Sequence, residues 1–275
     1  MTSFDIASLK ARAEAAISVA REVGRAAAAF RAEALPETLA VESKGTQDFV
    51  TVADKRAEGA IRTALLNAFP EDAFMGEEGG GVAGEGGTWV VDPIDGTTNY
   101  IRGFRHWGVS IAFVAAGEIL VGVIYDAAQD KVFHAIRGEG AFKDGTAIRA
   151  STTTDPGHAI AILGHSRRTD FEDYLAVSRR LYDRGIDYRR MGAAAIGLVR
   201  VAEGISDLYY ERQLSAWDML AGILIAREAG VEVSAPMLAE MIARGGPVVA
   251  CTPGLAAELA FLVEAAGLSK AAPAA

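Results

Sequence analysis

The sequence lacks the features that mark secreted and membrane-spanning chains. Among its 275 residues it has a single cysteine, Cys251, which cannot form an internal disulfide and fits a reducing compartment. No apolar run is long enough to span a bilayer, and the N-terminal segment has no apolar core followed by a cleavage site. These absences lead us to expect a cytoplasmic protein without membrane association.

Positive charge is also scarce. Lys and Arg number 27 against 36 Asp and Glu, which gives a formal net charge of −9. The Arg-Arg pairs that begin at residues 167, 179 and 189 are too scattered to form an evident basic stripe, so nucleic acid is not expected as a direct partner. With 51% hydrophobic residues, the chain is expected to be globular with a large core. An acidic protein of this kind would receive a small anionic substrate together with bound cations.

Two common kinds of catalytic site find no support in the sequence. The four histidines show no metal-ligand spacing and there is no cysteine cluster, which argues against zinc. No Gly-x-Ser-x-Gly or cysteine nucleophile is visible, which argues against a covalent enzyme intermediate.

The most informative stretch is residues 88–99, where an apolar strand leads into two carboxylates. Residues 88–91 predict a buried strand that ends at Asp92, held extended by Pro93, with Asp95 on the following turn. Gly96 would let a ligand approach the backbone, and Thr97 or the next threonine could cap a helix. Asp-Gly alone is ordinary turn chemistry. The whole stretch is more specific, because carboxylates for a hard cation beside amides for an anion describe a metal-assisted phosphate site.

Hydrophobic periodicity divides the chain into two halves. Residues 1–150 predict an α+β half that contains an amphipathic helix over 5–31, a hairpin within 41–54, a second helix and antiparallel strands from Trp107 onward. Residues 151–275 predict an α/β half of alternating strands and helices. The expected strands there are 159–163, 187–190, 207–211 and 248–251, and the expected helices are 171–182, 193–202 and 215–227.

Several charged residues have both a structural and a functional interpretation. Thr51 with Asp54, and Ser215 with Asp218, each have the spacing of a helix capping box. Glu77 precedes a glycine-rich segment, where adjacent glutamates are usually ordinary surface charge. Its place one loop upstream of Asp92 nevertheless makes it a candidate third ligand. Lys44 is either a solvated lysine or a cation that moderates an acidic site.

Three blocks resemble the signature blocks of the inositol monophosphatase family. They are GEE at residues 76–78, WVVDPIDGTTNY at 89–100 and WDMLAG at 217–222, and residues 44–54 resemble that family's N-terminal block. The similarity extends from about the first helix to the last. It implies a magnesium-dependent, lithium-sensitive phosphomonoesterase with the layered αβαβα sandwich of the sugar phosphatases, and a homodimer.

The resemblance also implies a set of metal ligands. Glu77, Asp92 and the carbonyl of Ile94 would hold one Mg²⁺, and Asp92, Asp95 and Asp218 would hold a second, so that Asp92 bridges the two. Glu77 could also contact a weaker third ion. Oxygen ligands of this kind suit Mg²⁺.

The remaining roles concern the water and the substrate. By resemblance, Thr97, hydrogen-bonded to Asp54, would activate the attacking water together with Glu77, while the amides of Gly96 and Thr97 receive the phosphate. The expected substrate contacts also include Asp95, Gly192, Ala194, Glu211 and Asp218. Glu211 resembles the acidic residue that accepts polyol hydroxyls in inositol-handling members, whereas Ala193 departs from the Ser or Thr often found at its position.

Three functions stay open at this point. The first is a phosphatase for inositol monophosphate or a similar polyol or sugar phosphate. The second is a histidinol-phosphate phosphatase, of which Trp107-Gly108 is reminiscent. The third is a regulatory binding partner, for example in transcription, which ranks low as a sole role because every metal position of the family pattern is intact.

Overall fold

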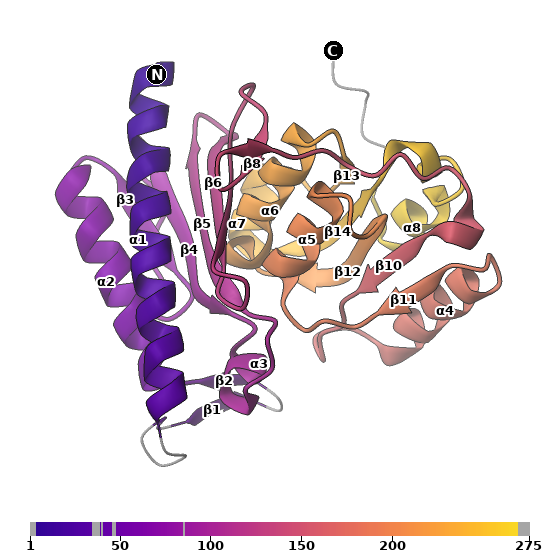
Figure 1. The fold of residues 1–275 in the computed structure, drawn as a ribbon, viewed down its shortest axis with the longest axis horizontal. Helices are drawn as coiled ribbons and strands as arrows, with labels where there is room; N and C mark the ends of the chain where they lie inside the picture. Colours follow the sequence, from indigo (N-terminus) through magenta and orange to yellow (C-terminus); the bar gives the residue numbers. More distant parts are fainter. Residues whose placement is uncertain (1–3, 35–38, 40, 46–47, 85, 269–275) are drawn as a thin grey trace.

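Five layers of helices and sheets make up the protein (Figure 1). The computed structural model describes residues 4–34, 39, 41–45, 48–84 and 86–268. A seven-stranded sheet has the order β3-β4-β5-β6-β7-β8-β9, and a five-stranded sheet has the order β11-β10-β12-β14-β13. Helices α1 and α2 cover one face of the larger sheet, α5 and α6 lie between the sheets, and α4 and α8 cover the outer face of the smaller one (Figure 1). This arrangement confirms the predicted αβαβα sandwich.

The helices and strands follow one another in a simple order. The helices are α1 (Ile6–Glu33), α2 (Val52–Ala68), α3 (Thr97–Arg102), α4 (Phe171–Tyr182), α5 (Ala194–Ala202), α6 (Ala216–Glu228), α7 (Leu238–Arg244) and α8 (Ala260–Ala265). The strands before residue 150 are β1 (Glu42–Gly45), β2 (Asp48–Val50), β3 (Ala73–Gly76), β4 (Thr88–Asp95), β5 (Gly108–Ala115), β6 (Glu118–Asp126), β7 (Lys131–Ile136), β8 (Ala141–Lys143) and β9 (Thr146–Ala147). The later strands are β10 (Ile160–Leu163), β11 (Asp187–Arg189), β12 (Leu208–Leu214), β13 (Glu232–Ser234) and β14 (Gly246–Cys251).

The pattern of apolar residues decides the place of each helix. Helix α1 has one apolar stripe, which is buried, while its other face is exposed. Helix α6 is apolar on nearly all sides and is buried along most of its length, because it lies between the two sheets. Gly122 on β6 permits this approach, since a Cβ there would lie 2.7 Å from the carbonyl oxygen of Ala221.

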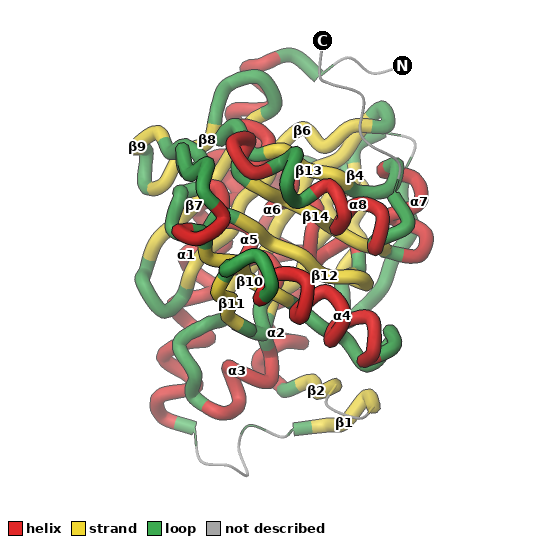
Figure 2. The backbone as a smooth tube through the Cα atoms, turned by 90° about the vertical axis from the view of Figure 1, so that its right-hand side faces the viewer, coloured by secondary structure: helices red, strands yellow, loops and turns green. Residues whose placement is uncertain are grey.

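The N-terminal hairpin and the helix that follows it agree with the prediction. Strands β1 and β2 pair antiparallel, and α2 begins with the expected capping box of Thr51 and Asp54. Both views place this hairpin and α3 at one end of the molecule (Figures 1 and 2). Lys44 lies on β1, and its side chain is outside the described part of the chain.

Strand β4 is longer than the sequence predicted. It was expected to end at Asp92, with Asp95 on a turn, but it continues to Asp95. Pro93 has no N–H to donate, so the pairing with β5 is interrupted between Asp92 and Asp95 and resumes where Asp95 faces Gly108. Asp92, Ile94 and Asp95 therefore all lie on one rigid strand.

The smaller sheet is mixed. Strands β11, β10 and β12 run parallel, as expected of an α/β arrangement, whereas β14 pairs antiparallel with both β12 and β13. Strand β13 and helix α7 were not predicted, because each is too short to show a clear periodicity. Within the described residues, no helix is both long enough and apolar enough to cross a membrane.

A buried ion pair fastens α1 to the larger sheet. Arg12 donates through Nε and Nη2 to both oxygens of Asp72, at 3.0 and 2.9 Å, and Trp89 Nε1 donates to the same carboxylate at 3.0 Å. The guanidinium also lies over the rings of Phe69 and Phe113. Helix and sheet are thus joined by a charge pair that is shielded from water.

We expect Arg12→Met to destabilise the protein by about 3–5 kcal/mol, because it leaves the Asp72 carboxylate buried without its cation. The free energy of unfolding in urea measures the effect. Lys10→Met is the control, since Lys10 is exposed and its pair with Glu139 at 3.4 Å should contribute less than about 1 kcal/mol. Equal losses in the two variants would contradict the role given to Arg12.

Candidate active site

Carboxylates from three parts of the chain meet at the end of β4. Glu77 comes from the turn after β3, Asp92 from β4 and Asp218 from the first turn of α6. Each offers an oxygen atom, and these atoms all lie within 4.8 Å of one another. The structure thus brings together residues that are separated by up to 141 positions, taken as 218 minus 77.

Asp92 lies at the centre of this cluster and is 2% exposed. Burial raises its pKa well above the ordinary value, and the nearby Glu77, Asp95 and Asp218 raise it further. Ile94 N donates to Asp92 Oδ1 at 2.9 Å, which fixes the orientation of the carboxylate. A divalent cation that prefers oxygen ligands would relieve this repulsion, so the donor set fits Mg²⁺.

Asp95 connects the end of β4 to the start of α5. Its two oxygens accept hydrogen bonds from Ala194 N at 3.0 Å and Ala195 N at 2.8 Å. Ala193 stands at the N-cap of α5 and has no side chain that could satisfy these amides, so Asp95 does so from another strand. Burial raises the pKa of Asp95 to about 7, against the lowering effect of the α5 amides.

The start of α3 differs from the expectation of a threonine cap. Gly96 is the N-cap, in the left-handed conformation with φ 89°, and no side chain caps the helix. A Cβ at Gly96 would lie 3.0 Å from the carbonyl oxygen of His106 and from Ala193 Cβ, so glycine is required there. Thr97 instead directs its hydroxyl to the carbonyl oxygen of Ile94, at 3.1 Å, and to Asp54.

Asp54 is held firmly beside Thr97. Its Oδ2 accepts from Thr51 N at 2.8 Å and Thr51 Oγ1 at 2.6 Å, while its Oδ1 lies 3.2 Å from Thr97 Oγ1. Burial raises the pKa of Asp54, and the Thr51 hydrogen bonds oppose that shift. The capping box predicted from the sequence therefore also orients a carboxylate toward the site.

Glu58 is a residue of the site that the sequence did not reveal. It is 4% exposed on α2, and its two oxygens accept from Glu78 N and Gly79 N, both at 2.8 Å. A Cβ on Gly76 would lie 2.2 Å from Glu58 Oε2. Glu58 therefore holds the turn that presents Glu77. Its only sequence signal is a charged residue on the apolar face of a predicted helix.

Asn99 ties α3 to the loop before α5. Its side-chain amide donates to the carbonyl oxygens of His106 at 2.7 Å, Met191 at 2.8 Å and Gly192 at 3.3 Å. Gly192 has φ 76°, and the amide of Ala194 is already taken by Asp95. The predicted substrate residues Gly192 and Ala194 thus border the start of α3, and Ala194 itself is buried.

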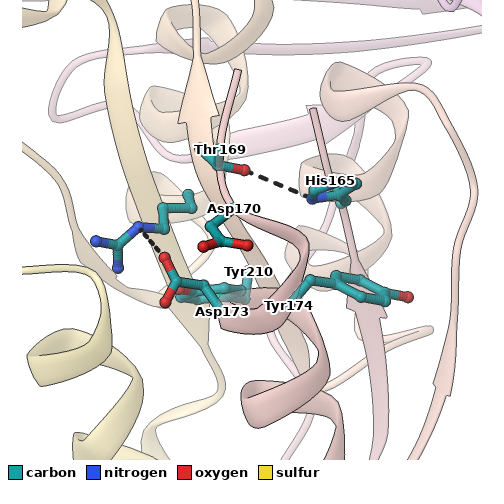
Figure 3. Close-up of a pocket in the computed structure, with 8 residues that line it drawn as sticks. His165, Thr169, Asp170, Asp173, Tyr174 and Tyr210 are labelled. Carbon is teal, nitrogen blue, oxygen red and sulfur yellow. Dashed lines mark hydrogen bonds and ion pairs between the residues drawn. The ribbon is translucent and has the colours of Figure 1, made fainter. Parts of the chain in front are cut away.

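Glu211 lies on β12, 8% exposed, on the side of the sheet that faces α5. Tyr209 Oη donates to its Oε2 at 2.7 Å. A Cβ at Gly164 would lie 1.8 Å from that oxygen, so the glycine leaves room for the carboxylate. Burial raises the pKa of Glu211 to about 7. Tyr210, the residue before Glu211 on β12, faces the opposite way and lines a separate small pocket against α4 (Figure 3).

The fold and the cluster describe a layered α/β protein with a carboxylate site suited to a hard cation. The chain belongs to the inositol monophosphatase family, whose model matches residues 12–267. Membership confirms the resemblance found in the sequence blocks and makes the chain a phosphatase-type hydrolase for a small phosphorylated substrate. The family depends on Mg²⁺ in general, which agrees with the donor set of the acidic cluster.

Individual relatives agree with this assignment. The inositol-1-monophosphatase of Rhizobium meliloti is 40% identical over 198 residues, which are 70% of this chain and 74% of that protein. The Nus factor SuhB of Pseudomonas aeruginosa is 38% identical over 227 residues, 80% of this chain and 83% of that one. The extragenic suppressor protein suhB of Bartonella henselae has a crystal structure similar to this one, with a TM-score of 0.84 and 32% identity, covering 92% of this chain and 97% of that chain.

The raised pKa of Glu211 predicts a specific dependence of stability on pH. Because its folded pKa of about 7 exceeds the ordinary value of 4.5, the folded state binds more protons in that interval, and stability falls as pH rises through it. We expect the free energy of unfolding of metal-free Glu211→Gln, taken relative to the wild type, to rise by about 3 kcal/mol between about pH 4.5 and pH 8, as an order of magnitude.

Urea unfolding of the metal-free proteins across this pH range measures the difference. Distant carboxylates titrate alike in both proteins, so the difference reports Glu211 together with its effect on the nearby Asp95 and Asp218. Glu258→Gln is the matched control, since its side chain is 49% exposed. A difference that does not change with pH would show that Glu211 titrates normally.

Proposed function

We propose that the protein hydrolyses a phosphate monoester in a Mg²⁺-dependent reaction, with inositol monophosphate or a similar polyol or sugar phosphate as substrate. The observation that carries this proposal is the cluster of Glu77, Asp92 and Asp218 oxygens within 4.8 Å of one another. Membership in a phosphatase family supports the reaction class. The printed name of the Rhizobium relative supports an inositol phosphate.

In this proposal the acidic residues hold two Mg²⁺ ions. Glu77, Asp92 and the Ile94 carbonyl would hold the first, Asp92, Asp95 and Asp218 would hold the second, and Glu77 would contact a weaker third. Both Asp95 oxygens already accept amide hydrogen bonds, but each keeps a further lone pair for a metal. Bound Mg²⁺ would supply charge neutralisation, a more acidic water and stabilisation of the leaving alkoxide.

The chain's own residues position the attacking water. Thr97 has one hydroxyl proton, and when it donates that proton to Asp54 its lone pairs are free to accept from a water. Asp54 is fixed by Thr51 and its burial favours accepting a proton. Glu77, in the carboxylate cluster with Asp92, would be a second acceptor. The water is thereby oriented with a lone pair toward phosphorus.

Other residues receive the two ends of the substrate. The amides of Gly96 and Thr97 at the start of α3 bind the phosphoryl oxygens. Glu211 accepts a hydroxyl of the leaving group, and Asp95 and Asp218 contribute further acceptors. Gly192 and Ala194 form the wall beside them. The short side chains on this wall support a ring-shaped or polyol leaving group.

Removal of the metal should abolish the reaction. We expect phosphate release from myo-inositol 1-phosphate to require added Mg²⁺ and to fall about 100-fold or more in Asp92→Asn, because the variant removes the central carboxylate of the cluster. Asp130→Asn is the control, since Asp130 lies on an exposed turn. The measurement is phosphate release with and without a chelator. Activity that survives both the chelator and Asp92→Asn would disprove the mechanism.

Histidinol phosphate is the alternative substrate, and it belongs in the same assay. A higher kcat/KM for histidinol phosphate than for inositol 1-phosphate would replace the polyol proposal while keeping the metal mechanism. Glu211 suits either substrate, because a carboxylate accepts from a polyol hydroxyl and also from the ammonium group of histidinol phosphate, so the ratio of the two kcat/KM values decides between them.

A regulatory role in transcription is a second candidate function. The relative from Pseudomonas aeruginosa carries the name Nus factor, which supports an interaction with other proteins. Asp92→Asn separates the two roles, since a binding function should survive in a folded variant that has lost phosphatase activity. Partner capture by this variant and by the wild type makes the comparison.

We also propose that the protein is a cytoplasmic homodimer. Phe171, Leu175 and Tyr182 lie along one exposed face of α4, at 53, 42 and 73% exposure, which supports contact with a second copy. The single cysteine, Cys251, is free and buried, as suits a reducing compartment.

Glu58 should matter for metal affinity although it is not a proposed ligand. We expect Glu58→Gln to weaken Mg²⁺ binding about tenfold or more, because one of the two turn amides would face a side-chain NH₂ instead of an oxygen. Isothermal titration with Mg²⁺ measures the affinity. Glu118→Gln is the control, with an exposed side chain. Unchanged affinity in a folded Glu58→Gln protein would refute the role.

A further inference from the structure

Three arginines lie beyond the carboxyl ends of adjacent parallel strands, next to the candidate active site. Arg167 and Arg168 follow β10, and Arg190 follows β11. Strands β11, β10 and β12 are neighbours in the smaller sheet (Figure 2), and β12 carries Glu211. Ligands of α/β sheets bind at this edge. We call these three residues the arginine rim.

The arginine rim has no carboxylate partner among the residues that the structure describes. Arg168 donates to Ser215 Oγ at 3.1 Å, and Arg190 donates to the carbonyl oxygen of His165 at 3.2 Å. The neighbouring Arg189, in contrast, pairs with Asp187 at 2.7 Å. Positive charge without a carboxylate partner beside an acidic site attracts anions.

The rim is joined to the acidic site through short contacts. Arg168 reaches Ser215 Oγ, and Ser215 N donates to Asp218 Oδ2 at 2.7 Å. Gly164, directly before the loop that carries Arg167 and Arg168, abuts the Glu211 carboxylate. The positive charges of Arg190 and Arg168 also act on Glu211 and lower its pKa, although burial outweighs them.

The loop that carries Arg167 and Arg168 is anchored at its base. Thr169 Oγ1 donates to the carbonyl oxygen of Ser166 at 3.0 Å and lies 3.5 Å from His165 Nδ1 (Figure 3). Arg212 on β12 pairs with Asp173 on α4 at 3.1 Å. The loop that carries Arg167 and Arg168 is therefore held by hydrogen bonds at its base, which reduces the cost of ordering it around a ligand.

We propose that the arginine rim binds a second anionic group, a phosphate or a carboxylate, on the leaving group of the substrate. This inference rests on the proposed phosphatase function, with the reacting phosphate at the acidic cluster. A leaving group that extends past Glu211 then meets Arg168 and Arg190. Guanidinium groups suit phosphate and carboxylate through paired N–H donors. Among the polyol and sugar phosphates of the proposed function, the preferred substrate is accordingly one that carries a second anionic group.

Two matched substrate pairs test the proposal. Myo-inositol 1-phosphate and myo-inositol 1,4-bisphosphate differ by a second phosphate, and glycerol 3-phosphate and 3-phosphoglycerate differ by a carboxylate in place of CH₂OH. The pairs separate the two kinds of anion. Each is assayed with Mg²⁺ in the wild type, in Arg168→Gln/Arg190→Gln and in the control Arg244→Gln, whose side chain is 75% exposed on α7.

We expect the wild type to have the higher kcat/KM for the doubly anionic member of at least one pair. The double variant should lose about tenfold on that member and little on its partner, and added salt should reduce the same preference. The loss should appear in KM with kcat nearly unchanged, because the rim is remote from the reacting phosphate. Arg244→Gln should keep the preference.

Other results would contradict either the role of the arginine rim or the proposed function. A wild type that hydrolyses the singly charged members without any preference, or a preference that the double variant keeps, would overturn the proposal and leave the phosphatase function standing. No phosphate release from any of the four compounds would disprove the proposed function itself. A double variant that keeps its preference but changes from dimer to monomer in light scattering would assign the rim to contact between copies of the chain.

Discussion

The site depends on groups that stabilise the negative charge of its buried carboxylates, and many of these groups are backbone amides. Asp54 accepts from Thr51, Asp95 from the start of α5, and Glu58 from the turn after Glu77. Hydrogen bonds from amides favour the charged carboxylate without neutralising it. The central group, Asp92, accepts one amide hydrogen bond and is surrounded by other acids, so either a proton or a bound cation is needed to stabilise it.

The same arrangement explains why the two halves of the chain form one unit. Helices α5 and α6 belong to the second half, yet they pack between the two sheets and bury one shared core. Their first turns contribute Asp218 and the amides that hold Asp95, and Asn99 adds three hydrogen bonds to the loop before α5. Neither half alone contains the complete cluster. Packing of the central helices therefore sets the geometry of the site.

Local signals predicted much of the fold, because helix and strand periodicity, capping boxes and turns are written in neighbouring residues. The bounds of α4, the β1–β2 hairpin and the five-layer order agree with the prediction. The sequence blocks also named Glu77, Asp92 and Asp218, which the structure brings together. The sequence did not reveal features that depend on contacts between distant residues. One is the extension of β4 past Pro93, which only the register with β5 reveals. Another is the role of Glu58, whose hydrogen-bond partners lie about 20 residues away.

The charges of the site are negative in its interior and positive at its edge. Carboxylates on β4, α2 and α6 lie in the interior. Glu211 lies on β12, and arginines without a carboxylate partner stand at the edge of the smaller sheet. A phosphate ester approaching a cluster of carboxylates is repelled until cations are bound, whereas the arginines attract it at every stage. Glu211, between the two regions, is buried enough to take a proton near neutrality. An uncharged Glu211 would remove the repulsion that a second anionic group would otherwise meet on its way to Arg168 and Arg190.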